Sequence, residues 1–307
     1  MITIVYLTSR RDPHYRWFVD SLTRQASQDF AWIKLVVVDF FAEEPGRSDV
    51  IYAPSGLKDF VHCTPKPNVW QGKYRLTKQD YFAASNARNT GLCHSKDGTV
   101  VFTDDLSVLL PGWYAAVKEA AAKRYVMSGA YKKMLELRVE EGLVASYKDF
   151  PPGVDCRWNQ GNDNGPIPAT PGWMFGCTLV APVEGMLAIN GFDEDCDSLG
   201  AEDYVAGYML KQAGYSLMYD RRAATYESEE GHHTGNVLKR IDKGVSPNDK
   251  SHKMLYFIEK GGRTRAPNYF GEEGIRGLRK RILAGEPFPI QQIPQHDWYD
   301  GQPLSEM

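Results

Sequence analysis

Short apolar segments that end in polar or acidic residues alternate with helical patterns along most of the chain. Residues 2–7, 32–41 and 99–103 are rich in Val, Ile, Leu and Phe, and we predict a buried strand in each. Residues 14–28 and 113–123 carry apolar side chains at helical spacing. Because uninterrupted apolar strands are typical of parallel sheets covered on both faces, this order predicts an α/β fold with a mixed, mostly parallel sheet flanked by helices.

The pattern is less regular in the middle of the chain and becomes clear again beyond residue 176. Residues 42–78 are rich in Pro, Gly and charge and predict a long irregular segment, whereas residues 79–92 predict a helix. Beyond this point we predict two strands, at 177–182 and 215–219, and two helices, at 183–189 and 203–213.

The charge distribution separates the end of the chain from the rest. The 307 residues have a net charge of −3, whereas residues 236–287 contain twelve Lys and Arg against six Asp and Glu, a local charge of +6. We therefore expect an α/β domain over 1–235 and a basic, partly helical C-terminal extension over 236–307. The overall charge argues against a dedicated nucleic-acid binder, although the extension could attract a polyanion to one face.

Several classes of protein are disfavoured by what the sequence lacks. No apolar run approaches the roughly 20 residues that a membrane span requires, and the first residues lack the order of a signal peptide, so we expect a soluble cytoplasmic protein. The cysteines are odd in number and widely spaced without a C-x-x-C pair, which predicts buried reduced thiols rather than a zinc or redox site. They are Cys63, Cys93, Cys156, Cys177 and Cys196.

The strongest local signal is the pair Asp104 and Asp105, which follows the strand predicted at 99–103. Ligands of open α/β sheets bind at the carboxyl ends of the strands. One of these carboxylates could hold Mg²⁺ or Mn²⁺ while the other accepts a hydrogen bond from a hydroxyl group. The alternative is an ordinary acidic turn that caps the following helix.

Two other predicted strands also end in polar residues. Asp39 ends one of them, and Thr8, Ser9 and Arg10 follow the first strand. An aspartate there could accept from the N–H of a nucleobase, and the hydroxyl and guanidinium groups could hold phosphate oxygens. The sequence contains neither G-x-x-x-x-G-K-[ST] nor G-x-G-x-x-G, which argues against P-loop kinases and dinucleotide dehydrogenases.

Two further groups of residues could carry chemistry. Glu202 and Asp203 open a predicted helix, where a carboxylate could act as a general base or simply stabilise the helix N-terminus. His232 and His233 follow an acidic run, and a neutral imidazole could complete a metal site. Adjacent histidines point apart, so we expect only one of them to bind; a solvated acidic loop is the alternative.

The order of these signals resembles the GT-A-fold glycosyltransferases, particularly family-2-like enzymes and the galactosyltransferase and N-acetylgalactosaminyltransferase group. The segment AASNARNTGL (83–92) is similar to the A-A-R-N-x-G helix of that group, and VVFTDDLSVLLPGW (100–113) is similar to its metal-motif strand. The segment NGFDE (190–194), followed by Glu202 and Asp203, resembles the acceptor-side segment G-F-D-E…G-x-E-D. The resemblance extends over residues 2–235 and implies a Rossmann-like GT-A sheet.

For the donor, the resemblance implies a nucleotide sugar, usually a UDP sugar. Asp39 would then contact the base, Asp104 the ribose and Asp105 a divalent metal. Thr8, Arg10 and Arg88 would lie near the nucleotide or its diphosphate, and His232 or His233 would join the metal. The motif departs from its commonest D-x-D form because Thr103 occupies the first acidic position.

For the acceptor side, the resemblance implies that Asp203 is the catalytic base and that Trp173, Gly176 and Glu202 shape the sugar and acceptor pocket. Where relatives have W-G before E-D, this chain has Leu199 and Gly200, so acceptor choice could differ. We expect metal-dependent single displacement with inversion at the anomeric carbon.

Two alternative functions and several acceptors remain open at this stage. A sugar-nucleotide pyrophosphorylase shares carboxylates at strand ends but should carry a Gly-rich basic loop after the first strand. A carbohydrate-binding module would be rich in aromatic residues but needs neither carboxylate pair. Small molecules, glycans, proteins and hydroxymethylated DNA are all conceivable acceptors, and the basic extension favours a polyanion.

Overall fold

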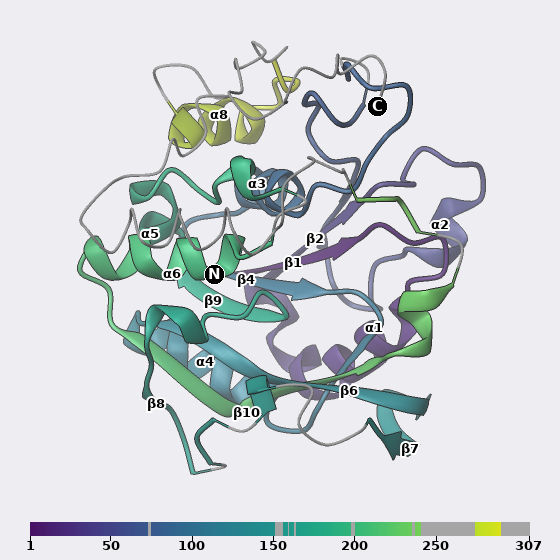
Figure 1. The fold of residues 1–307 in the computed structure, drawn as a ribbon, viewed down its shortest axis with the longest axis vertical. Helices are drawn as coiled ribbons and strands as arrows, with labels where there is room; N and C mark the ends of the chain where they lie inside the picture. Colours follow the sequence, from purple (N-terminus) through teal and green to yellow (C-terminus); the bar gives the residue numbers. More distant parts are fainter. Residues whose placement is uncertain are drawn as a thin grey trace.

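A computed structural model describes residues 1–72, 75–150, 156–158, 160–162, 164–197, 200–234, 237–240 and 274–289. A single mixed sheet runs through the molecule in the order β3-β2-β1-β4-β9-β6-β10-β5, with β7 paired to β6 and β8 to β10 (Figure 1). The strands are β1 (Ile2–Thr8), β2 (Ile33–Asp39), β3 (Asp59–Cys63), β4 (Thr99–Asp104), β5 (Ser107–Leu109), β6 (Val126–Glu140), β7 (Leu143–Asp149), β8 (Ile167–Pro168), β9 (Thr178–Pro182) and β10 (Leu217–Ser228).

Helices cover both faces of this sheet. The α-helices are α1 (Tyr15–Ala26), α2 (Arg47–Val50), α3 (Ala84–His94), α4 (Trp113–Lys123), α5 (Val183–Ala188), α6 (Glu202–Gln212) and α8 (Gly274–Leu283). Short 3₁₀ turns are η1 (Ser27–Trp32), η2 (Cys156–Trp158), η3 (Pro171–Trp173), η4 (Glu194–Cys196) and η5 (Glu230–His233). The predicted mixed α/β architecture is confirmed.

Alternating side chains of the central strands form two separate cores. Ile4 and Tyr6 of β1 pack with α1 and α4 on one face, whereas Val5 and Leu7 pack with α3, α5, α6 and α8 on the other (Figure 1). Because successive side chains of a strand point to opposite faces, a strand buried on both sides is apolar at most of its positions. This requirement accounts for the uninterrupted apolar runs in the sequence.

Strand register brings the predicted site residues to one edge of the sheet. β1 pairs in parallel with β2 and with β4, so that Thr8 lies opposite Asp39 and Leu7 opposite Asp104. β6 runs in the same direction as these strands, because β9 pairs antiparallel with both β4 and β6. β10 pairs in parallel with β6 and therefore runs in that direction too. β3 also pairs in parallel with β2, so the carboxyl ends of six strands lie toward the same edge.

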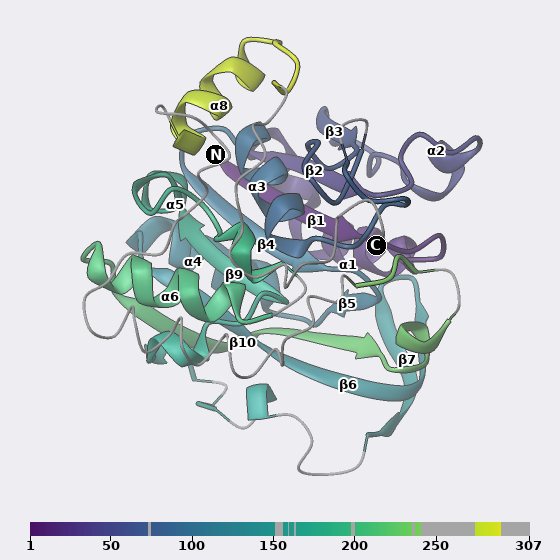
Figure 2. The ribbon, with the colours of Figure 1, turned by 45° about the horizontal axis from the view of Figure 1, so that its top comes forward.

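Helix α8 of the basic C-terminal segment lies at the opposite edge. Helix α8 packs on α3, and its Arg279 binds the Ser95 carbonyl at 2.8 Å and Asp97 at 2.7 Å, just before the start of β4. Figure 2 shows α8 (yellow) lying against α3. The basic residues of α8 therefore lie away from the carboxyl ends of the strands, whereas Arg240 of the same segment lies at that edge. Residues 241–273 and 290–307 lie outside the described part.

Candidate active site

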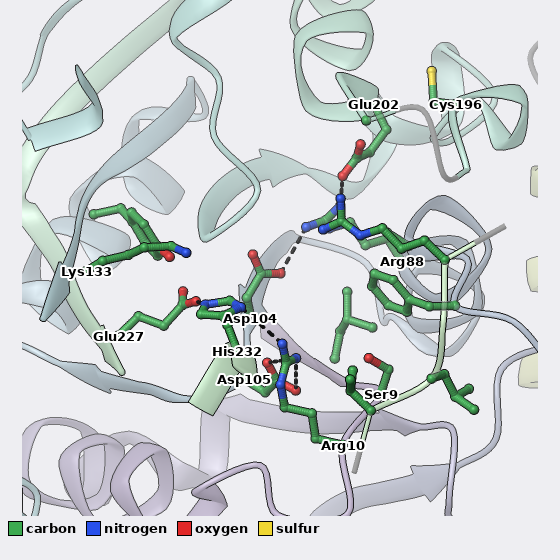
Figure 3. Close-up of a pocket in the computed structure, with 18 of the residues that line it drawn as sticks. Ser9, Arg10, Arg88, Asp104, Asp105, Lys133, Cys196, Glu202, Glu227 and His232 are labelled. Atoms are coloured by element: carbon green, nitrogen blue, oxygen red, sulfur yellow. Dashed lines mark hydrogen bonds and ion pairs between the residues drawn. The ribbon is translucent and has the colours of Figure 1, made fainter. Parts of the chain in front are cut away.

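A pocket of about 370 Å³ lies over the carboxyl ends of the strands (Figure 3). It is lined by acidic, basic and apolar residues from segments far apart in the sequence. Those that carry charge or an imidazole are Arg10, Arg88, Asp104, Asp105, Lys133, Arg157, Glu202, Glu227, His232 and Arg240. The number of cations is high for so small a cavity, and it suits an anionic ligand such as a diphosphate.

Asp104 and Asp105 leave β4 in different environments. Asp104 is the more accessible of the two, with a side chain 34% exposed, and it accepts a hydrogen bond from Arg88 at 2.9 Å. Asp105 is only 8% exposed, and its carboxylate accepts from Thr8 Oγ1 at 2.7 Å and from Arg10 at 2.9 and 3.1 Å. Burial raises the pKa of Asp105, and the Arg10 guanidinium opposes that rise.

Arg88 connects the two halves of the pocket. Its guanidinium donates to Asp104 and also to Glu202 at the start of α6 (Figure 3). It also explains why a glycine stands at position 176, because a Cβ there would lie 2.3 Å from Arg88 Nη2. Arg88 is buried, and its charge is balanced by these two carboxylates together with that of nearby Asp203.

Asp203 lies directly behind this layer. Its Oδ2 accepts from the Gly176 amide and its Oδ1 from the Tyr204 amide, both at 2.9 Å. Burial, followed by the neighbouring Glu202 carboxylate, raises the pKa of Asp203 to about 7. A carboxyl with such a pKa suits proton transfer near neutral pH.

The end of β10 and the following turn η5 contribute a carboxylate–imidazole pair. Glu227 hydrogen-bonds His232 Nε2, and His232 Nδ1 lies 3.1 Å from Arg10 Nη2. Burial raises the pKa of Glu227 to about 8, with a smaller contribution from Asp104 and Asp105. Burial, together with the nearby cations Lys133 and Arg10, lowers the pKa of His232 to about 3, so its imidazole is neutral.

A short strap crosses the pocket. Residues 237–240 are held on one side by a hydrogen bond from the Leu238 amide to the Ser9 carbonyl at 3.1 Å. On the other side, the Phe82 amide donates to the Lys239 carbonyl at 2.8 Å. Val237, Leu238 and Arg240 of this strap line the cavity.

The structure brings most, but not all, of the sequence-predicted residues to this pocket. Arg10, Arg88, Asp104, Asp105, Glu202 and His232 line it. Thr8 donates to Asp105 and Gly176 packs against Arg88, whereas Asp203 lies behind them and accepts from the Gly176 amide. Trp173, Asp39 and His233 do not line it. The roles assigned to all of these residues stay predictions.

Asp39 and His233 make contacts with residues outside the pocket. Asp39 is fully buried and accepts from Arg47 at 2.6 and 3.0 Å and from His62 at 2.9 Å. His233 is 74% exposed and contacts Glu229 at 3.1 Å. Of the two adjacent histidines, His232 is therefore the one that faces the pocket, as expected for side chains that point apart.

Sequence reasoning did not single out several lining residues. Tyr131, Lys133 and Arg157 were not predicted, and neither was Arg240 of the strap. Glu227 belongs to the acidic run that was noted, but no role was assigned to it. The alternation of charged and apolar residues around Lys133 was the signal that could have placed it on a strand.

The chemistry of the pocket suits a divalent metal, although its donors are not gathered around a metal position. Asp104, Asp105 and Glu227 offer oxygen ligands and His232 offers a nitrogen ligand, a set that Mn²⁺ accepts. Among the described residues no group of three or more His, Cys, Asp or Glu side chains lies close enough to hold a metal ion. Arg10 lies between Asp105 and His232 instead.

Two enzymes of known structure have the same fold as this chain. No family model and no curated protein sequence matches it. The structure of GalNAc-T7 with UDP, GalNAc and Mn²⁺ aligns with a TM-score of 0.52 and 14% identity over 94% of this chain. The S. aureus TarS 1–349 structure in complex with UDP-GlcNAc aligns with a TM-score of 0.54 and 13% identity over 92% of this chain.

The lengths covered in these proteins differ. The chain matches 55% of the GalNAc-T7 chain, about half its length, and 70% of the TarS chain. At such low identity the likeness establishes the fold alone. No helix among the described residues is long and apolar enough to cross a membrane. The predicted GT-A fold is confirmed: this chain has the GT-A fold that GalNAc-T7 and TarS share.

Proposed function

We propose that the chain is a glycosyltransferase that moves a sugar from a nucleoside diphosphate donor, UDP in particular, to an acceptor hydroxyl group. The observation that carries this proposal is the strand-end pocket, in which several cations surround the Asp104–Asp105 pair within a GT-A fold. The structural neighbours support it, because GalNAc-T7 was solved with UDP and TarS with UDP-GlcNAc.

The donor diphosphate would lie against the basic lining of the pocket. Lys133, Arg157 and Arg240 lie around the cavity beside Arg10 and supply charge-assisted hydrogen-bond donors for its oxygens. Asp104, the more exposed carboxylate, would accept from the ribose hydroxyl groups. A divalent metal would be held by Asp105 and His232, and its chemistry when bound is to neutralise charge on the departing diphosphate.

Asp203 would act as the general base on the acceptor side. With a pKa raised to about 7 the carboxyl is partly ionised near neutral pH, and its ionised form can take the proton of the attacking hydroxyl. The hydrogen bonds from Gly176 and Tyr204 fix its orientation and leave each oxygen a second lone pair. Direct attack on the anomeric carbon inverts its configuration.

The acceptor is the least constrained part of the proposal. The described basic helix α8 lies at the far edge of the sheet and does not support an anionic acceptor. The cations of the pocket would contact only the donor and the first groups of the acceptor. We expect transfer to be insensitive to Lys280→Glu together with Arg281→Glu; a steep loss would restore a polyanion such as hydroxymethylated DNA as acceptor.

Thermal unfolding with nucleotides tests the proposed function. A ligand at a hundred times its Kd stabilises the folded state by about 2.7 kcal/mol, which raises the Tm by several degrees. UDP with Mn²⁺ should raise the Tm, and free sugars should not. A carbohydrate-binding module would respond to sugars alone, and a pyrophosphorylase would respond to UTP in preference to UDP.

A further inference from the structure

The side chain of Arg10 occupies the donor atoms that a metal would need. Its Nη1 lies 2.9 Å from Oδ1 and 3.1 Å from Oδ2 of Asp105, so both carboxylate oxygens face the guanidinium. Its Nη2 lies 3.1 Å from Nδ1 of His232. One cationic side chain therefore bridges a carboxylate and an imidazole that lie far apart in the sequence.

The hydrogen bonds determine which nitrogen of His232 is free to bind a metal. A guanidinium only donates hydrogen bonds, so Nδ1 must be the unprotonated nitrogen that accepts from Arg10. The proton of the neutral ring is then on Nε2, which donates to Glu227. The lone pair of Nδ1, the only one on this ring able to coordinate a metal, is thus held by Arg10.

The backbone of Arg10 is fixed although its side chain is on a flexible stem. Its amide donates to Thr8 Oγ1 at 3.1 Å, and its carbonyl accepts from Arg47 Nη2 at 2.7 Å. Arg47 is itself buried against Asp39, which anchors this loop to the end of β2. The guanidinium faces the pocket, and its movement away from Asp105 and His232 would also break the hydrogen bond that its Nε donates to the Gly231 carbonyl at 3.3 Å.

We propose that Arg10 is a displaceable counter-ion of the metal site: a divalent cation binds Asp105 and His232 only when the guanidinium leaves them. The second part of this inference rests on the proposed function, because the diphosphate of the donor receives the released guanidinium. Metal and nucleotide then strengthen each other's binding, because once one of them has displaced the Arg10 side chain the other binds without that free-energy cost.

The size of the effect follows from the interaction that is lost. A hydrogen bond between charged groups is among the stronger ones in proteins, and here two join Arg10 to one carboxylate. Removing this competitor should raise the affinity for Mn²⁺ by about tenfold or more. Removing a cation that acts only through its electrostatic field in the pocket should raise the Mn²⁺ affinity less.

Direct Mn²⁺ binding without nucleotide tests the first part. Electron paramagnetic resonance counts free Mn²⁺ in titrations of the wild type, Arg10→Met and the matched control Lys133→Met. Lys133 also lines the pocket but pairs with Glu229 at 2.7 Å. Arg10→Met should bind Mn²⁺ at least about tenfold more tightly than the wild type. Adding Asp105→Asn to Arg10→Met should abolish the gain.

The outcomes separate the inference from its alternatives. A gain in Arg10→Met no larger than that in Lys133→Met would show a general field effect and overturn the proposal. Unchanged or weaker Mn²⁺ binding would do the same. If Arg10→Met fails to fold, NMR of arginine Nε–H groups in the wild type replaces it: Mg²⁺ should shift the Arg10 resonance, and an unshifted resonance at saturation would contradict displacement.

A second titration with UDP present tests the coupling. UDP should raise the Mn²⁺ affinity of the wild type more than that of Arg10→Met, because the variant has no guanidinium to move. If UDP binds neither protein, the proposed function fails while the displacement result without nucleotide still stands. If UDP binds and raises the Mn²⁺ affinity equally in both proteins, the coupling through Arg10 is wrong.

Discussion

Arg88 on α3 and Asp104 at the end of β4 are joined by a hydrogen bond of 2.9 Å, and the same guanidinium also binds Glu202 on α6. This arrangement links the side of the pocket proposed for the nucleotide to the side proposed for the acceptor. Because Arg88 is buried between them, both carboxylates depend on one cation for their orientation.

Replacing Arg88 should therefore impair both the nucleotide side and the acceptor side of the pocket. Arg88→Met removes charge-assisted hydrogen bonds to two carboxylates, and we predict that kcat/KM falls by about tenfold to a hundredfold. Arg88→Lys keeps the charge but lacks the planar fork, so it should restore only part of the activity. Steady-state kinetics on the two variants measure this, and full activity in Arg88→Met would contradict the linking role.

Gly176 should not tolerate a side chain. The Cβ of Gly176→Ala would meet Arg88 Nη2, which its two carboxylate partners prevent from moving freely, and we predict a loss of about 1–3 kcal/mol in stability. Gly172→Ala is the matched control, because its Cβ would meet only Thr170 Oγ1 at 3.9 Å. Chemical denaturation of both variants compares them; equal stabilities would show that Arg88 moves away without cost.

The raised pKa of Asp203 should set the pH dependence of transfer. Below about pH 7 the carboxyl becomes protonated and cannot accept a proton, so kcat/KM should fall about tenfold for each further pH unit. Above pH 7 it should level off. Asp203→Asn should lose at least about 10²-fold in rate, retain donor binding and lack this dependence.

Glu202→Gln serves as the control for that experiment. Glu202 is adjacent and lines the pocket, but in our account it does not take the proton. Its variant should keep a pH dependence with the same sign. A pH profile that disappears in Glu202→Gln and persists in Asp203→Asn would transfer the role of base to Glu202.

A buried ion pair behind the site should govern stability. Lys66 Nζ lies 2.7 Å from Glu194 Oε1, and both side chains are almost completely buried. Lys66→Met leaves the Glu194 carboxylate without this cation, and we predict a loss of about 3–5 kcal/mol in the free energy of unfolding. Urea denaturation measures this loss.

Lys118→Met provides a comparison at the same distance. Lys118 lies 2.7 Å from Asp29, but the Lys118 side chain is 53% exposed and that of Asp29 31%, so solvent screens the pair and the loss should be much smaller. Similar losses in the two variants would mean that the Lys66–Glu194 pair is hydrated like a surface pair.

Much of the sheet could be predicted because its strands are buried on both faces. The apolar runs at 2–7 and 99–103 became β1 and β4, and the helix predicted at 113–123 has the observed bounds of α4. Strands β6 and β7 were missed because the second half of β6 and most of β7 face solvent and carry many charged residues. β10 was predicted only over its first residues, since it continues through two arginines.

The residues of the candidate site could likewise be predicted only in part. Asp104 and Asp105 were predictable because a buried strand fixes where they emerge, and Thr8, Arg10 and Asp39 followed by the same reasoning. The contact between Arg10 and His232 could not be predicted, because it depends on how β10 pairs with β6. Similarly, the burial of Asp39 by Arg47 depends on a loop with no regular pattern.

Hydrolysis of the donor in the absence of acceptor tests the central claim most directly. The purified chain with Mn²⁺ should release UDP slowly from at least one UDP sugar, and Asp105→Asn, which keeps the fold, should release none above background. Absence of UDP release from every UDP sugar tested, or an unchanged rate in Asp105→Asn, would contradict the account of this pocket as a metal-assisted nucleotide-sugar site.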